Sequence, residues 1–300
     1  MSFTGDTAAE AFATQYKKEN KKACCKRAFA LGMSLGARAT ETKRELRLSF
    51  RERPLADNAA EIFNAVFHAK AIVTEEKIVG RDYYTVTFFS FGIWDFLKLA
   101  DTAAPIESSA GLKCESCEGA FLRGMFVGCG SLTDPKKAYH LELTFPNEAR
   151  ANAVLEMLSD KFGRLGKITR GNRTSLYYKG NVAIAGFIYG IGCTHAGYAI
   201  DNSYIEKNIR NAENRATNCV ARNISRSVEA AREHIIAIEN LQNSGKMDLL
   251  PDELRYTAKL RIENESATLT ELALMHEPPL TKSGLNGRLK RLLKAAKEDS

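Results

Sequence analysis

Cysteine is the residue type whose spacing most directly suggests metal or redox chemistry in this chain. Cys114-Glu-Ser-Cys117 supplies half of the ligands of a zinc ribbon, but no second pair lies near it in the sequence. Cys24 and Cys25 stand at the predicted start of another helix, so the four sulfur atoms converge if the two helices start side by side. They would then form a four-thiolate zinc or redox site. The alternative, which the sequence favours, is reduced cysteines at two helix starts, with no metal and no cofactor.

Other catalytic motifs do not occur in the sequence. The histidines form neither an HExxH motif nor a pair with a nucleophile, and they are scattered at His68, His140, His195, His234 and His276. There is no Walker loop, and Gly190-Ile-Gly192 is where a predicted helix ends. We therefore expect no small-molecule substrate.

A basic helix near the end of the chain suggests nucleic-acid binding. Thr268-Leu-Thr-Glu271 is a capping box that opens a short helix ending near His276. Glu277-Pro-Pro-Leu280 forms the turn, and a second helix starts at about Thr281. Its buried face consists of Leu285, Leu289 and Leu292. A short helix, a tight turn and a basic helix predict a helix-turn-helix.

In that motif the start of the second helix enters the major groove of DNA. The candidate base-reading residues are Lys282, Ser283 and Asn286, because Asn suits adenine, Lys suits guanine and Ser is permissive. The candidate phosphate contacts are Arg288, Lys290, Arg291 and Lys294. The alternative is an ordinary basic surface helix.

An internal repeat organises the first two thirds of the chain. The segment from Cys25 to Gly36 returns as Cys117 to Gly128, with matching Ala, Phe, Met and Gly at one offset. Both copies are apolar with helical periodicity and carry Gly-xxx-Gly, which leaves one helix face without side chains. Glycine costs about 1 kcal/mol in a helix. We therefore expect the two helices to pack closely on each other about a pseudo-two-fold axis.

The segments after the two copies are also alike. A strand, an amphipathic helix, a hairpin and a short apolar helix are predicted twice, in repeats of about 24–100 and 116–195. Between the repeats and the helix-turn-helix, residues 205–240 contain neither Pro nor Gly and predict one long or once-broken helix rich in Asn and Arg. This helix offers possible DNA or interdomain contacts at Arg215, Asn218 and Arg222, or it is a solvated connector.

Composition and charge agree with a nucleic-acid partner. The 300 residues are 44% hydrophobic and 26% charged with a net charge of +7, which excludes a disordered or disulfide-stapled protein. Seven cysteines without a secretory leader, and no apolar run longer than Val182 to Gly192, predict a cytoplasmic, nucleoid-associated protein. Besides the last helix, a basic cluster near the start suggests a polyanionic partner, and it consists of Lys17, Lys18, Lys21, Lys22, Lys26 and Arg27.

The duplicated unit resembles the LAGLIDADG homing endonuclease fold, in which two such helices pack together and two sheets straddle DNA. In those nucleases an acid near the base of each helix binds a divalent metal for phosphodiester cleavage. Alignment on Gly32 and Gly124 puts Ala37 and Cys129 in the two acid positions, and Asp134 lies too far along to substitute. The resemblance therefore implies the scaffold of a nuclease without its catalytic residues.

The order of the duplicated domain, the Asn/Arg-rich helix and the helix-turn-helix along the chain resembles that of the WhiA family of bacterial transcriptional regulators. The residues that carry this resemblance are Cys24-Cys25-Lys-Arg-Ala-Phe29, Ala120-Phe-Leu-Arg-Gly-Met-Phe126, Tyr139-His-Leu-Glu142, Arg210-Asn211, Asn214-Arg215, Asn218 and Leu269 to Leu289. The resemblance implies promoter binding through a terminal domain similar to that of a sigma factor, with roles in cell division, chromosome segregation or sporulation. A protein co-regulator is a further possible partner, and no membrane is expected.

The fold class that we expect is α+β. Duplicated LAGLIDADG-like repeats form one pseudo-two-fold domain, and an all-α helix-turn-helix domain follows. The expected segments are an N-terminal extension (1–23), the duplicated domain (24–200), an Asn/Arg-rich helical linker (201–245) and the helix-turn-helix domain (246–300). The alternatives are an active LAGLIDADG-type endonuclease or maturase, and a structural or RNA-binding protein.

Overall fold

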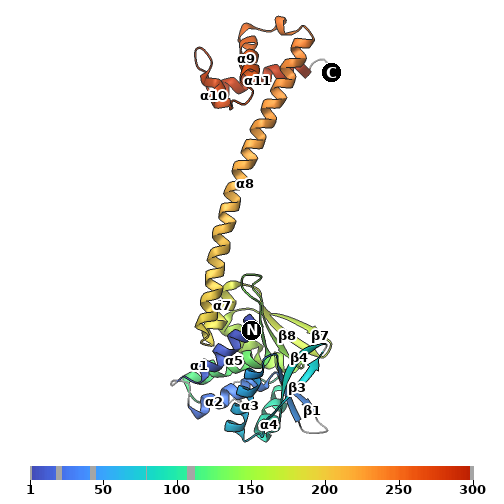
Figure 1. The fold of residues 1–300 in the computed structure, drawn as a ribbon, viewed down its shortest axis with the longest axis vertical. Helices are drawn as coiled ribbons and strands as arrows, with labels where there is room; N and C mark the ends of the chain where they lie inside the picture. The colour runs from blue at the N-terminus through green and yellow to red at the C-terminus, as the bar shows by residue number, and fades with distance from the viewer. Residues whose placement is uncertain (1, 18–21, 41–44, 79, 107–111, 298–300) are drawn as a thin grey trace. The chain divides into compact units, whose positions relative to one another are not determined.

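A computed structural model describes residues 2–17, 22–40, 45–78, 80–106 and 112–297 (Figure 1). The chain forms two compact units, Met1–Lys207 and Asn208–Ser300. Lys18 and Lys21 of the predicted basic cluster lie outside the described residues.

Two glycine-containing helices, α2 (Ala23–Ser34) and α5 (Glu115–Cys129), pack directly on each other at the centre of the first unit. A methyl group on Gly32 would overlap the carbonyl oxygen of Phe121, and one on Gly124 would overlap that of Phe29. The contacts are therefore reciprocal, as a pseudo-two-fold axis requires. The predicted close approach of the two copies is confirmed.

Each repeat contributes one four-stranded antiparallel sheet (Figure 1). The first sheet has the order β1-β2-β4-β3 and the second the order β5-β6-β8-β7. The strands are β1 (Arg38–Thr40), β2 (Glu45–Phe50), β3 (Ile72–Ile78), β4 (Arg81–Phe88), β5 (Gly130–Leu132), β6 (Leu141–Phe145), β7 (Gly166–Arg170) and β8 (Arg173–Tyr178). In β2 the side chains of Leu46, Leu48 and Phe50 are buried and alternate with outward polar residues. The identical strand order confirms the duplicated α+β unit.

The remaining helices of the first unit bury their apolar faces in one continuous core. They are α1 (Phe3–Gln15), α3 (Arg53–Phe67), α4 (Phe91–Ala100), α6 (Glu148–Phe162) and α7 (Asn181–Gly190). Helix α1 comes from the segment expected as an N-terminal extension. Its Phe12 is buried against the ring of Phe29 in α2, and Thr4 bonds the backbone of Leu132. The extension is thus part of the packed core of this unit.

Helix α8 (Thr194–Asn243) is a single helix of 50 residues, and the division between the two units falls within it. It begins earlier than the predicted residue 205, because Glu10 of α1 accepts hydrogen bonds from the backbone nitrogens of His195 and Ala196. All side chains from Asn208 to Glu229 are exposed.

In the described part of the second unit every regular element is a helix. After the end of α8 this unit contains η2 (Met247–Leu249), α9 (Asp252–Glu263), α10 (Leu269–Leu274) and α11 (Lys282–Lys297). Its core is small and apolar, and it includes Ile238, Leu241, Leu254, Ala258, Leu272, Leu285, Leu289 and Leu292. Among the helices described in either unit, none is both long enough and apolar enough to cross a bilayer.

Candidate nucleic-acid interface

The two positions where the LAGLIDADG resemblance places acids lie at the far ends of α2 and α5. Ala37 and Cys129 are both buried, and a methyl group on Gly36 would lie 3.3 Å from the sulfur of Cys129. The two positions therefore adjoin, as they would around a shared metal. Neither side chain offers a carboxylate oxygen, the ligand that magnesium prefers. Asp134 instead accepts a hydrogen bond from the backbone nitrogen of Lys136 at 2.9 Å.

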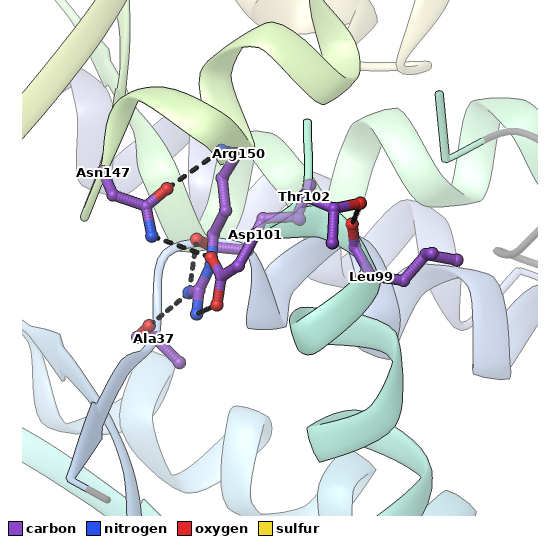
Figure 2. Close-up of polar contacts among 7 residues, drawn as sticks. Ala37, Leu99, Asp101, Thr102, Asn147 and Arg150 are labelled. Carbon is purple, nitrogen blue, oxygen red and sulfur yellow. Dashed lines mark hydrogen bonds and ion pairs between the residues drawn. The ribbon is translucent and has the colours of Figure 1, made fainter. Parts of the chain in front are cut away.

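A buried arginine lies beside Ala37 (Figure 2). Nη1 of Arg150, from α6, donates to the carbonyl oxygen of Ala37 at 2.6 Å. Nε and Nη2 of Arg150 bind the two carboxylate oxygens of Asp101 at 2.7 and 3.1 Å, and Asn147 Nδ2 donates to Oδ1 of Asp101 at 2.7 Å. Asp101 is the residue that ends α4, and the side chain of Arg150 is only 2% exposed. The guanidinium thus brings a fixed positive charge to the region.

This arrangement does not suit the binding of a divalent metal ion. The guanidinium of Arg150 repels a divalent cation, and the carboxylate of Asp101 already accepts three hydrogen bonds, two from Arg150 and one from Asn147. Burial raises the pKa of the Cys129 thiol, although the positive charge of Arg150 opposes that shift. Cys129 therefore stays a neutral thiol. Sequence reasoning missed Arg150, because an arginine in the first turn of an amphipathic helix normally faces solvent.

The second unit contains the predicted helix-turn-helix. Thr268 accepts a hydrogen bond from the backbone nitrogen of Glu271, whose carboxylate accepts one in return from the nitrogen of Thr268. This is the predicted capping box, and its backbone bond from Thr268 lowers the pKa of the Glu271 carboxyl. The hydroxyl of Thr281 accepts from the nitrogen of Gly284 at 3.1 Å and so caps α11.

Helix α11 presents polar and basic residues away from its leucine face. Leu285, Leu289 and Leu292 are buried, as predicted. Lys282 and Ser283 are exposed in the first turn, and Asn286 is half-buried one turn later. Lys290 and Lys294 are exposed further along the helix. The candidate base-reading residues therefore share the N-terminal end of one helix.

Two of the predicted phosphate contacts are held by an acid. Arg288 Nη2 lies 3.3 Å from Oε2 of Glu253, and Arg291 Nη2 lies 2.8 Å from its Oε1. Glu253 belongs to the first turn of α9, so this carboxylate fastens α9 to α11. Both arginines can reach a phosphate only in competition with Glu253.

The candidate contacts on α8 are placed differently. Arg215, Asn218 and Arg222 are all exposed. They lie in the stretch of α8 where every side chain is in solvent. They lie at i, i+3 and i+7, so they form one strip along the helix.

The packing of α2 on α5 brings together the four cysteines at the starts of these helices. The sulfur atoms of Cys24, Cys25, Cys114 and Cys117 all lie within 4.8 Å of one another at the starts of α2 and α5. Hydrogen bonds from the thiols of Cys117 and Cys25 lower the pKa of Cys114 to about 7. Burial raises the pKa of Cys25 and of Cys117.

Comparison with known protein families gives the same two parts. A model described as the WhiA LAGLIDADG-like domain matches residues 118–210, and one described as the WhiA C-terminal HTH domain matches residues 214–296. "Probable cell division protein WhiA" of Caldicellulosiruptor saccharolyticus is 35% identical over 187 residues, which are 62% of this chain and 58% of that protein. The protein of the same name from Carboxydothermus hydrogenoformans is 36% identical over 181 residues, 60% of this chain and 58% of that protein. The matched region therefore spans less than two thirds of the length of either relative.

Solved structures agree on the fold. The crystal structure of full-length WhiA from Thermatoga maritima covers 99% of this chain and 99% of its own, with a TM-score of 0.59 at 24% identity. The N-terminal LAGLIDADG domain of WhiA covers 64% of this chain and 90% of its own, with a TM-score of 0.50 at 20% identity. Two models of one family account for most of the chain from residue 118 onward, and the fold of that family extends over nearly all of it. The chain therefore carries the two domains that the WhiA family models describe, and it has the fold of a full-length WhiA protein.

Proposed function

We propose that this chain is a non-enzymatic, sequence-specific DNA-binding transcriptional regulator that reads promoter DNA through α11. The observation that carries the proposal is the capped α10–turn–α11 arrangement, with Lys282 and Ser283 exposed in the first turn of α11. A helix presented in this way enters the major groove with its N-terminal residues against the base edges.

The proposed roles follow from the side-chain chemistry. Lys282 donates to guanine, Asn286 pairs with adenine, and Ser283 adapts to either partner. Lys290 and Lys294 bind phosphates, together with Arg288 and Arg291 once DNA competes with Glu253. Arg215, Asn218 and Arg222 add a polar strip for DNA backbone or interdomain contacts. The proposed domain boundaries are 1–23, 24–200, 201–245 and 246–300, with the last of these segments as the reader.

The contacts of Arg150 in the first unit support the non-enzymatic part of this proposal. Arg150 supplies a cation beside Ala37 and Cys129, where a nuclease would gather carboxylates around a metal. The names of the relatives support a role in cell division. We extend the proposal to chromosome segregation or sporulation, to action in the cytoplasm at the nucleoid, and to a protein co-regulator.

Capture of sequenced genomic fragments by the full-length protein tests the proposal. Enrichment of a small set of intergenic sites is expected, with no cleavage of the captured DNA when magnesium is present. Lys282→Ala with Asn286→Ala should reduce the preference for those sites by about tenfold or more, because each paired base contact contributes about 1–3 kcal/mol of discrimination. Nonspecific binding should remain.

The matched control is Lys259→Ala with Asn243→Ala, which removes the same residue types from exposed positions on α9 and α8. It should keep the wild-type preference. Equal loss in both double variants would refute the assignment of base readers, and magnesium-dependent cleavage by the wild-type protein would refute the non-enzymatic role.

A further inference from the structure

A cluster of four cysteines lies at the opposite end of the paired helices from Ala37 and Cys129. Cys24 and Cys25 occupy the first turn of α2, Cys114 is the N-cap residue of α5, and Cys117 lies in the first turn of α5. Cys25 and Cys117 are buried, whereas Cys24 and Cys114 are partly exposed. The cluster is therefore enclosed on one side and reachable from solvent on the other.

Four of the six distances between the sulfur atoms are close to those of a tetrahedral metal site, and all six are within 4.8 Å. The separations are 3.7 Å for Cys24–Cys114, 3.5 Å for Cys25–Cys114, 4.0 Å for Cys25–Cys117 and 3.4 Å for Cys114–Cys117. Four sulfurs at about 2.3 Å from one zinc ion stand about 3.8 Å apart along each edge of the tetrahedron. From this geometry we propose that Cys24, Cys25, Cys114 and Cys117 bind one Zn²⁺ ion as a structural four-thiolate site.

Other assignments fit the geometry less well. A disulfide brings two sulfurs to about 2.05 Å, well inside each of these separations. An iron–sulfur cluster also takes four thiolates, but it places several atoms between them and holds the sulfurs further apart than a single ion does. Four neutral thiols without a metal would satisfy one another only through weak hydrogen bonds.

The charges around the cluster suit an anionic centre. Zinc with four thiolates carries a net charge of −2, and the N-terminal ends of two helices both point their positive dipole ends at it. Lys22, Lys26 and Lys113 flank the cysteines in the sequence. Of the two acids in the first turn of α5, Glu118 is paired with Lys161 at 2.6 Å and Glu115 is exposed to solvent. Binding would release the thiol protons to solvent, with no change of oxidation state.

The site would have a mechanical purpose in the fold. The glycine contacts of Gly32 and Gly36 hold α2 against α5 further along the pair. A zinc ion at the helix starts would tie the first repeat to the second where those backbone contacts have not yet begun. Since the ion binds only the folded arrangement, it would raise the stability of the duplicated domain.

Metal analysis of the full-length protein, purified without chelators or immobilised metal, tests the site. We expect about one zinc per chain in the wild type. Cys114→Ser and Cys117→Ser should each lose most of it. Cys219→Ser is the matched control, because Cys219 is an exposed cysteine of α8 outside the cluster, and it should keep the full zinc content.

A second measurement on the wild type remains informative if the cluster variants fail to fold. Chelator-treated protein is titrated with Co²⁺, and a tetrahedral thiolate site gives strong visible bands and a sulfur-to-cobalt charge-transfer band that saturate at one equivalent. Zinc should then displace the cobalt and raise the melting temperature. Absence of both the zinc and the cobalt bands, stoichiometric iron in place of zinc, or a Cys114–Cys117 disulfide in freshly reduced and desalted protein would overturn the proposal.

Discussion

Nη1 of Arg150 lies 2.6 Å from the carbonyl oxygen of Ala37, so a cation of the second repeat is bonded to the first repeat. The same guanidinium holds Asp101, which ends the last helix of the first repeat. Helices α3 and α6 have equal length and occupy equivalent places in the two repeats. Leu55 is the third residue of α3 and is therefore the equivalent of Arg150, the third residue of α6. The pseudo-two-fold symmetry of the domain is therefore broken by a charge on one side and an apolar side chain on the other.

Replacing this arginine should be costly. Arg150→Leu removes the donor to the carbonyl of Ala37 and leaves Asp101 with only the hydrogen bond from Asn147, so we expect a loss of about 3 kcal/mol in the free energy of unfolding. Arg53→Leu is the control, because Arg53 makes an exposed pair with Asp57 and should contribute less than about 0.5 kcal/mol. Urea unfolding of both variants checks this, and equal midpoints would contradict the role given to Arg150.

The glycines of the paired helices give a second prediction. Gly32→Ala should destabilise the first unit by at least about 2 kcal/mol, because the added methyl overlaps the backbone of Phe121. Gly186→Ala, in the exposed face of α7 with open space around it, should instead stabilise by up to about 1 kcal/mol. Thermal melting of the two variants should move in opposite directions. If both melting temperatures moved in the same direction, the result would count against the close packing of α2 on α5.

Much of this architecture could be predicted from local patterns. The glycine spacing revealed the paired helices, because a helix face without side chains needs a close neighbour. The capping box at Thr268 and the leucine spacing of α11 placed the helix-turn-helix. Arg150 could not be found in this way, since its burial depends on Ala37 and Asp101, which are distant in the sequence. The convergence of the cysteines likewise depended on how two helices pack.

The salt bridges of Glu253 should restrain DNA binding. Glu253→Gln frees Arg288 and Arg291, so affinity for duplexes of unrelated sequence should rise. The slope of log affinity against log salt should steepen by about 1 for each arginine that gains a phosphate. Fluorescence anisotropy at several salt concentrations measures both quantities.

Glu263→Gln provides the control for that experiment. It removes the same charge from α9 but releases only Lys259, so it should change the affinity slightly and leave the salt slope unchanged. If both variants steepen the slope equally, net charge rather than arginine release is responsible.

Two buried histidines make the second unit sensitive to acid. Burial lowers the pKa of His234 and of His276, and the charges of Arg261 and Arg288 act in the same direction. The unfolded chain, with a normal histidine pKa of about 6.5, then binds protons before the folded one does. Stability is complete above that value and falls as the pH decreases from it through the lower folded pKa.

The melting temperature of the helix-turn-helix unit should therefore be lower at about pH 5.5 than at about pH 7.5. His276→Asn should reduce the difference, whereas His195→Asn, at an exposed position on α8, should leave it unchanged. A wild-type melting temperature that does not depend on pH would contradict the lowered pKa of both histidines in the folded state.

The position of Arg150 also makes a metal site difficult to build at Ala37 and Cys129. Aspartates introduced at Ala37 and Cys129 would meet a guanidinium and form salt bridges with it before any magnesium could bind. Removing Arg150 first would break its bonds to Asp101 and to the Ala37 carbonyl. The intermediate sequence would then be less stable than the present one. Neither order of substitution therefore leads directly to a metal site, because Arg150 either pairs with the new carboxylates or takes its bonds to Asp101 and Ala37 away with it.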